Sequence, residues 1–263
     1  WARLEPQEGV FSMEEIGKVR QEIELLHQNN IHVLLTLHHF SNPLWFERQG
    51  AFLGKNAVEQ FLAMVEFAVR QLGDLVDEYV TVNEPNVYAV CGYLGGGFPP
   101  GEFSMPHALR VMKVLGECHR RAYRLIHRIH EELGYAEPKV GLAMHMRAFV
   151  PYNAKNLWHR IACRISEYNF QTKLNKTYML GRDCRYADFL GLNYYARTAT
   201  SGLGDGTLPH VPVNDLGWEI YPEGIVRCAQ KLEKLLRRPI WVTENGTCDN
   251  QDAFRARYLY EHL

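Results

Sequence analysis

Apolar residues alternate between helical and strand spacing along the chain. After Ser12–Glu15, which has the form of a capping box, apolar side chains recur every three or four positions as far as Gln28. This spacing predicts an amphipathic helix. Residues 31–37 then form a short apolar run of the kind that is buried on both faces of a parallel sheet. The pattern therefore begins as a helix followed by a strand.

The same alternation continues to the end of the sequence. Further strands are predicted at residues 78–82, 139–144, 188–192 and 239–243, and further helices at residues 58–72, about 105–133, about 156–180, 225–237 and 253–263. Trp1–Arg3 is expected to be the tail of one more strand. Because each strand leads into a helix, a parallel sheet is predicted. No linker, repeat or low-complexity tract divides the chain, so residues 1–263 are expected to form one catalytic domain.

Two architectures satisfy a run of parallel strand and helix units: a closed barrel and an open doubly wound sheet. An open sheet usually carries a glycine-rich phosphate loop after its first strand, and the sequence has none there. Gly95–Gly97 does not lie between a strand and a helix in the G-x-G-x-x-G pattern, so we read it as a loop. We therefore predict an α/β protein of the (β/α)8 TIM-barrel type.

The charge composition argues against two classes of binding partner, nucleic acids and anionic membranes. The 29 basic and 30 acidic residues leave a formal net charge of -1, without the basic surface expected of a protein that binds nucleic acid or an anionic membrane. No stretch approaches the roughly 20 consecutive apolar residues of a membrane span, and the first residues lack the pattern of a signal peptide. The six cysteines form no C-x-x-C pair, so free thiols and a reducing cytoplasm are expected.

Polar side chains follow the predicted strands at the ends where a barrel enzyme keeps its working residues. The segments are His38–Phe40, Asn83–Pro85, His145, Asn193–Tyr195 and Glu244–Gly246. Two carboxylates among them, Glu84 and Glu244, come from different strands and are expected to face one cavity. Such a pair suits glycoside hydrolysis, in which one carboxyl group protonates the leaving oxygen and the other attacks the anomeric centre or holds water against it. The groups suited to bind sugar hydroxyls are His39, Asn83, Asn193 and Tyr195.

Several short motifs occur in a fixed order along the chain. They are Leu37-His-His-Phe40, Thr81-Val-Asn-Glu-Pro85, Phe98-Pro-Pro-Gly101, Gly191-Leu-Asn-Tyr-Tyr195, Gly217-Trp-Glu-Ile-Tyr-Pro-Glu-Gly224 and Val242-Thr-Glu-Asn-Gly246. In this order the motifs closely resemble those of glycoside hydrolase family 1, the β-glucosidases and their relatives. The resemblance covers essentially the whole chain.

The resemblance implies a retaining β-glycosidase that hydrolyses β-O-glycosides or oligosaccharides by double displacement, without a cofactor or metal. Glu244 matches the family nucleophile and Glu84 matches the acid/base. Glu84 is expected to be protonated and Glu244 ionised, because two carboxyl groups roughly 5 Å apart resist carrying two charges. Asn83 and His39 match positions that bind ring hydroxyls, and Tyr195 matches one that orients the nucleophile. Glucose, galactose, fucose and phosphorylated sugars all remain open as the glycone.

The sequence departs from the family pattern at both ends. It starts after the strands that carry a sugar-binding Gln and an Arg in the family, and it stops in the helix after Glu244, before the last family strand. About six of the eight barrel units are therefore expected. The unpaired edges of such a barrel invite self-association or a complementing fragment. The alternative function is a catalytically impaired sugar-binding or scaffold fragment.

Histidines supply two weaker candidates for a metal site. His38 and His39 point to opposite sides of a strand, which disfavours a shared metal. His38 is therefore expected to be a packing residue or a residue that supports the site from behind. His119, His127 and His130 lie on one predicted helix, where a solvated helix face is favoured over a metal site.

Overall fold

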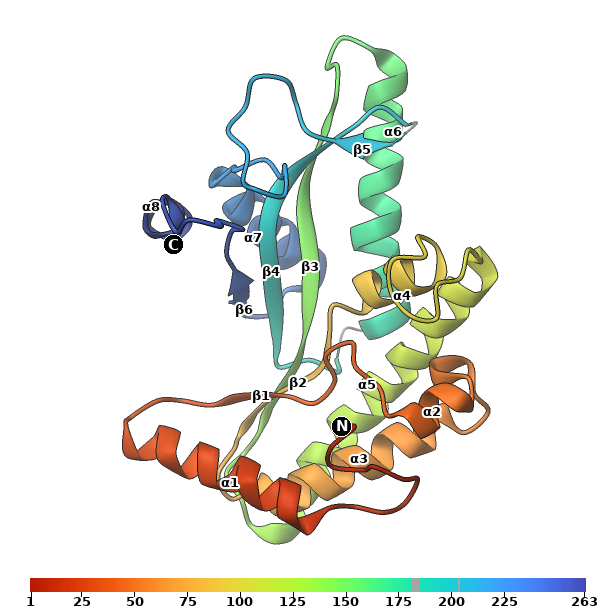
Figure 1. Ribbon diagram of the computed structural model, residues 1–263, viewed down its shortest axis with the longest axis vertical. Helices are drawn as coiled ribbons and strands as arrows, with labels where there is room; N and C mark the ends of the chain where they lie inside the picture. The colour runs from red at the N-terminus through yellow and green to blue at the C-terminus, as the bar shows by residue number, and fades with distance from the viewer. Residues whose placement is uncertain (181–184, 203) are drawn as a thin grey trace. The chain divides into compact units, whose positions relative to one another are not determined.

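The computed structural model describes residues 1–180, 185–202 and 204–263, and these form two compact units (Figure 1). Unit 1 comprises Trp1–Leu142 and Tyr178–Phe189, and unit 2 comprises Ala143–Thr177 and Leu190–Leu263. The boundary passes through strands β3 (Lys139–Pro151) and β4 (Phe189–Thr200). Along the sheet the strand order is β1-β2-β3-β4-β5, with β6 paired to β4. The assignment of the whole chain to one domain stays a prediction.

Unit 1 builds two parallel strands and the helices that follow them. Its elements are α1 (Met13–Gln28), β1 (Leu34–Thr36), α2 (Leu44–Arg48), the 3-10 helix η1 (Ala51–Leu53), α3 (Ala57–Leu72), β2 (Glu78–Asn83), α4 (Pro85–Tyr93) and α5 (Met105–Leu133). Strands β1 and β2 pair in parallel, with Leu34 opposite Glu78. All six residues of β2 are buried, and α3 packs against α5. The buried strand therefore needs hydrophobic or hydrogen-bonded residues at every position.

Capping residues set the ends of the helices in unit 1. The Ser12 hydroxyl accepts a hydrogen bond from the backbone N–H of Glu15 at 3.2 Å, as the capping box predicts. The long helix α5 ends at Gly134, which adopts φ 68°, a left-handed conformation that costs glycine little. The start of α1 is thus set by a side-chain hydrogen bond and the end of α5 by the backbone freedom of glycine.

Unit 2 carries the remaining strands. Besides its parts of β3 and β4 it contains α6 (Leu157–Glu167), most of the π-helix η2 (Tyr168–Leu180), β5 (Asp205–Gly206), α7 (Glu223–Leu236), β6 (Ile240–Asn245) and α8 (Arg255–His262). Strand β6 pairs in parallel with β4, and the register shifts at a bulge between Leu192 and Asn193. Strand β5 instead pairs antiparallel with the far end of β4, where Ala199 lies opposite Gly206. One long strand therefore joins the parallel sheet to a hairpin.

The predicted alternation of helices and strands is confirmed, with several differences. Trp1–Arg3 is part of a turn rather than a strand, since the backbone N–H of Glu5 bonds back to the carbonyl of Trp1. Strands β3 and β4 run on to Pro151 and Thr200, so His145 and Asn193–Tyr195 lie within strands rather than after them. The predicted helix over residues 156–180 changes to π-helix at Tyr168. Finally, the sequence did not predict α2, η1, α4 or β5.

The cysteines in the described ranges are free thiols: Cys91, Cys118, Cys163, Cys228 and Cys248. Cys184 lies outside the described residues. Within those ranges, none of the helices combines the length and the hydropathy that crossing a bilayer requires.

Candidate active site

In unit 1, the first group of predicted site residues lies where β1 and β2 end. The ladder between the two strands continues past β1, because the backbone N–H of Asn83 bonds to the carbonyl of His38 at 2.9 Å. The amide of Asn83 donates to Nε2 of His39 at 3.1 Å. Backbone pairing thus brings His39 and Asn83, which are 44 positions apart, into direct contact beside Glu84.

Glu84 sits at an unusual backbone position. It adopts φ 43° and ψ 58°, the left-handed conformation, and forms the N-cap of α4 with Pro85 as the first helical residue. The backbone N–H of Tyr88 bonds to the Glu84 carbonyl at 3.0 Å, and the Glu84 residue is only 6% exposed. A residue with a Cβ pays a steric cost in this conformation. Such strain is found where a turn must aim a side chain at a functional site.

His38 has a structural role, which confirms its interpretation as a packing residue. Its ring packs edge-on against Phe52 with the centroids 5.2 Å apart, and Nε2 donates to the side-chain oxygen of Asn42 at 2.9 Å. Burial lowers the pKa of His38 to about 4, because a buried imidazole resists taking a charge. His38 is therefore neutral at physiological pH.

In unit 2, Glu244 is held by a second group of residues on β4 and β6. The Tyr195 hydroxyl donates a hydrogen bond to Oε2 of Glu244, and Asn193 lies opposite Glu244 in the strand register. The Thr243 hydroxyl donates to Oδ1 of Asn193 at 2.6 Å. The resemblance implied that Tyr195 orients Glu244, and the structure contains the hydrogen bond that this role requires. The catalytic roles themselves stay predictions.

Residues behind this group fix its backbone. The Asn245 amide donates to the carbonyl of Tyr194 at 2.7 Å, and the Tyr258 hydroxyl donates to the carbonyl of Tyr195 at 3.0 Å. Tyr258 lies on α8, and sequence reasoning missed it because no motif connects it to β4. These contacts hold the two strands in the register that puts Tyr195 beside Glu244.

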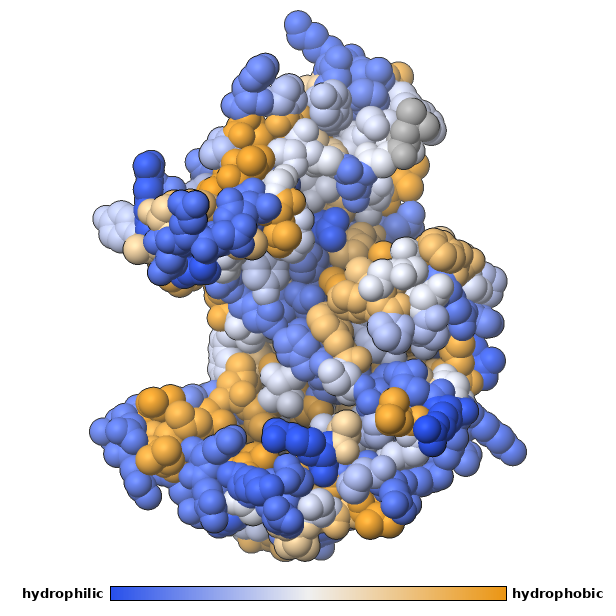
Figure 2. Space-filling model, in the orientation of Figure 1, coloured by the Kyte–Doolittle hydropathy of each residue, from blue (hydrophilic) through white to orange (hydrophobic). Residues whose placement is uncertain are grey.

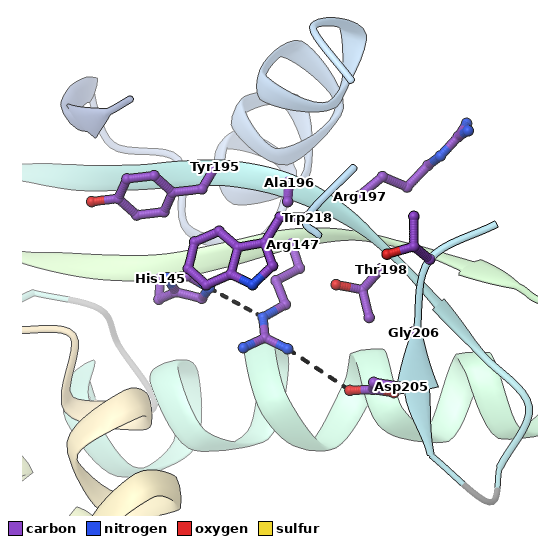
Figure 3. A pocket seen from close by; sticks show the side chains of 10 residues that line it. His145, Arg147, Tyr195, Ala196, Arg197, Thr198, Asp205, Gly206 and Trp218 are labelled. Carbon is purple, nitrogen blue, oxygen red and sulfur yellow. Dashed lines mark hydrogen bonds and ion pairs between the residues drawn. The ribbon is translucent and has the colours of Figure 1, made fainter. Parts of the chain in front are cut away.

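A cavity of about 180 Å³ opens beside Tyr195 within unit 2 (Figure 3). His145 and Arg147 of β3, Asp205 of β5 and Trp218 contribute to its lining. The His145 ring lies nearly parallel to the Tyr195 ring, with the centroids 5.8 Å apart. Sequence reasoning named His145 at a strand end and Trp218 only as part of the Gly217–Gly224 motif. It missed Arg147 and Asp205, because they lie beyond the predicted strand ends.

The Gly217–Gly224 motif contributes a buried ion pair. Glu219 is 2% exposed and accepts a hydrogen bond from the guanidinium of Arg197. The same guanidinium lies 4.0 Å from the centroid of the Tyr221 ring, within the range of a cation–π contact. This arrangement fixes Arg197 and the loop that carries Trp218.

The prediction that the histidines of α5 lie on a solvated helix face is wrong for His119 and His130. His119 and His130 are buried, and they hydrogen-bond the hydroxyls of Thr81 and Tyr79 on β2. His127 contacts Asp188 at 3.1 Å. Within residues 1–180, 185–202 and 204–263, no three His, Cys, Asp or Glu side chains gather as a metal site would require.

The structure thus brings the predicted site residues together in two groups, one in each unit. His39, Asn83 and Glu84 form the first, and Asn193, Tyr195 and Glu244 form the second. The family model of glycosyl hydrolase family 1 matches residues 1–186, which is more than half of the chain and includes the first group.

This chain belongs to glycosyl hydrolase family 1.

Known relatives resemble this family 1 chain over its whole length. It is 28% identical to the galactolipid galactosyltransferase SFR2, chloroplastic, of Arabidopsis thaliana, and the match covers 100% of the chain and 44% of that relative. It is 27% identical to a β-galactosidase of Sulfolobus acidocaldarius, again over 100% of the chain and 60% of the relative. The chain therefore spans about half the length of the curated relatives it matches.

Solved structures show the same fold. A β-glycosidase from Pyrococcus horikoshii superimposes with a TM-score of 0.88 at 29% identity, covering 100% of this chain and 64% of the other. A β-glucosidase from Thermotoga maritima in complex with deoxynojirimycin gives a TM-score of 0.87 over 67% of its length. The fold is therefore of the (β/α)8 barrel type, as predicted, and the chain corresponds to about two thirds of these barrels.

Proposed function

We propose that this protein is a retaining β-glycosidase of the β-glucosidase type, with Glu244 as nucleophile and Glu84 as acid/base. The hydrogen bond from Tyr195 to Glu244 carries the proposal, because a donor on a carboxylate oxygen fixes its direction and leaves the other oxygen for attack. Membership of the family supports the same roles, because the matched residues 1–186 include Thr81–Pro85. Val242–Gly246 lies beyond that match and resembles the family's nucleophile motif.

The reaction proceeds in two displacements. In the first, a Glu244 oxygen bonds to the anomeric carbon while the bond to the leaving oxygen breaks, and Glu84 gives its proton to that oxygen. In the second, the Glu84 carboxylate takes a proton from water, which attacks the anomeric carbon and releases Glu244. Asn83 and His39 bind hydroxyls of the same sugar ring. Each carboxyl group is thereby restored to its starting state.

A mechanism-based inhibitor tests these roles. A 2-deoxy-2-fluoroglucoside with a dinitrophenol leaving group should label the protein once, on the peptide that contains Glu244. Glu244→Gln should take no label. Glu84→Gln should still be labelled, because dinitrophenolate leaves without a proton. Glu233→Gln, which changes an exposed glutamate on α7, is the matched control and should label like the wild type. Sugar binding without any label would instead support the sugar-binding alternative.

Transfer of the glycosyl group to a second sugar is a related candidate. The relative named as a galactolipid galactosyltransferase is similar over the whole chain, and a covalent glycosyl group on Glu244 can be attacked by a sugar hydroxyl in place of water. Adding an acceptor sugar to the hydrolysis assay decides between the two. Transfer products that grow with acceptor concentration support transfer, and glucose release alone supports hydrolysis.

The free thiols support a reducing compartment such as the cytoplasm. Two relatives carry the word chloroplastic in their names, so a second reducing compartment is compatible with the same thiols. Fractionation of tagged protein would distinguish these locations.

A further inference from the structure

Helix α6 exposes its large apolar residues and buries its small ones, which reverses the usual pattern of a surface helix. Ala162 and Cys163 are only 6% and 7% exposed and form its buried face. Figure 2 shows apolar side chains at the surface over α6. Five large apolar residues in α6 and at the start of η2 are between 41% and 66% exposed: Leu157, Trp158, Ile161, Ile165 and Tyr168. Adjoining exposed apolar residues of this kind mark a contact surface.

These five residues form a continuous apolar stripe along one face of the helix. Leu157, Ile161 and Ile165 are four positions apart, and Tyr168 follows three positions later with φ -62° and ψ -49°, which are helical angles. Residues at these spacings lie above one another on a helix. Trp158 widens the stripe in the first turn. Tryptophan and tyrosine thus occupy its two ends, and both combine a large apolar ring with a polar group, as residues at a water–lipid boundary do.

The surface around the apolar stripe is basic. Arg160 and Arg164 form a second row beside the stripe, Lys155 precedes the helix, and all three residues are exposed. From residue 152 to residue 177 the chain has five Lys or Arg residues and a single acidic residue, Glu167. The carboxylate of Glu167 is already held at 2.6 Å by a lysine of α7. The balanced net charge of the whole chain, -1, therefore hides one locally basic surface.

The combination of an apolar stripe and a basic row requires a partner with negative charge. A neutral surface would cover the stripe but leave the row unmatched. A second copy of the chain would bring its own Arg160 and Arg164 to the same interface, where like charges oppose association. An apolar layer beneath anionic headgroups satisfies the stripe and the row together.

We infer that α6 docks this protein on an anionic phospholipid surface. The helix lies in the plane of that surface, with the apolar stripe at the boundary between the headgroups and the acyl chains. Lys155, Arg160 and Arg164 contact the lipid phosphates from the rim of the stripe. These residues take no part in the proposed glycosidase reaction, so vesicle binding and hydrolysis are measured independently of each other.

Cosedimentation with lipid vesicles tests the docking. The full chain should bind vesicles of equal parts phosphatidylglycerol and phosphatidylcholine roughly tenfold or more tightly than vesicles of phosphatidylcholine alone, because neutral headgroups do not attract the basic row. Raising the salt from about 0.1 M to about 1 M shortens the screening length from about 10 Å to about 3 Å. This change should weaken binding to the anionic vesicles by a similar factor.

Substitutions of single exposed residues separate the contributions of the row and the stripe. Arg164→Gln should weaken binding about fivefold, the equivalent of one Lys or Arg near an anionic surface. Ile165 is 53% exposed, and Ile165→Gln should weaken binding roughly fivefold to tenfold, because the side chain no longer enters the lipid. The matched controls are Arg128→Gln on α5 and Leu25→Gln on α1, which also change exposed residues of helices and should bind like the wild type.

Tryptophan fluorescence shows which surface touches the lipid. Anionic vesicles with bromine on the acyl chains should quench part of the emission of the wild type, and Trp158→Phe should remove that quenching while most of the binding remains. Three results would overturn the inference: no binding to anionic vesicles, equal binding by the α6 variants and their controls, or undiminished quenching in Trp158→Phe. A dimer that Ile165→Gln dissociates, in the absence of vesicle binding, would show that the stripe contacts a second copy instead.

Discussion

At the scale of single residues, the Tyr195 hydroxyl contributes most directly to the proposed chemistry. It donates to Oε2 of Glu244, and its backbone carbonyl is itself held by Tyr258 at 3.0 Å. A hydrogen bond to a charged group contributes about 1.5–3 kcal/mol. The side chain is therefore positioned to orient the carboxylate without taking part in bond formation.

Tyr195→Phe should lower kcat by one to two orders of magnitude, since about 1.4 kcal/mol corresponds to a tenfold change in rate. The rate of labelling by the fluoroglucoside should fall by the same factor, because kcat and the labelling rate both depend on attack by Glu244. Tyr260→Phe changes a tyrosine that is 88% exposed and should have no effect. An unchanged labelling rate in Tyr195→Phe would show that the hydroxyl does not position Glu244.

The backbone of Glu84 offers a second prediction at this scale. Its φ of 43° is costly for any residue with a Cβ, by roughly 1–2 kcal/mol. Glu84→Gly should therefore be about 1 kcal/mol more stable than Glu84→Ala in urea unfolding, although both lose the acid/base. At Glu22, an exposed residue inside α1, the order should reverse, because glycine lowers helix stability relative to alanine. Equal stability of the two Glu84 variants would show that the left-handed backbone at this position carries no steric cost.

At the scale of elements, two glycines inside helices show how packing decides the effect of one methyl group. Gly17 in α1 has nothing within 4 Å of the position of a Cβ. Gly116 in α5 would place a Cβ 1.9 Å from the carbonyl oxygen of Tyr178. In α5 the missing side chain allows the backbone of another segment to approach the helix.

Gly17→Ala should stabilise the protein by about 0.5–1 kcal/mol, because alanine loses less backbone entropy on folding. Gly116→Ala should destabilise it by about 1–3 kcal/mol or more, since a backbone carbonyl must move to make room. Urea unfolding of the two variants and the wild type measures both effects. The same sign for both changes would disprove the close approach at Gly116.

The elements also differ in how well local pattern predicts them. The helix predicted at about residues 105–133 is α5, Met105–Leu133. Local pattern sufficed there because the apolar spacing and the terminal glycine are local signals. The far end of β4 was not predicted, because its pairing with β5 is a contact between separate segments. The helix α4 follows a strained turn at Glu84, which no propensity favours.

At the scale of the whole molecule, two buried histidines couple stability to pH. His38 and His119 are 1% and 0% exposed, and burial lowers the pKa of each to about 4. In the unfolded chain an imidazole has a pKa of about 6.5. Above pH 6.5 both states are neutral and the native state has its full stability. Below it the unfolded state binds protons that the native state excludes, so stability falls as the pH drops towards 4.

Each histidine should contribute a slope of up to about 1.4 kcal/mol per pH unit between pH 6 and 4.5. His119→Gln should reduce the measured slope by that amount, whatever its effect on stability at pH 7. His27→Gln, at an exposed position on α1, is the matched control. The measurement is urea unfolding at several pH values, and an unchanged slope in His119→Gln would show that this histidine does not resist protonation.

The sequence by itself determined the family, the order of strands and helices and the identity of both proposed catalytic glutamates. The family and the glutamates follow from short motifs, and the order of elements follows from the spacing of apolar residues. Both signals lie in residues that are close together in the sequence. The resemblance implied that Tyr195 orients Glu244, and the structure contains the hydrogen bond between them. Only the tertiary structure showed that Tyr258 holds the backbone of Tyr195, that Glu84 has a left-handed backbone, and that a cavity lies between Arg147, Asp205 and Trp218. Each of these features depends on strand register or on side chains brought together from distant segments. The local spacing of residues encodes neither the register nor those long-range contacts.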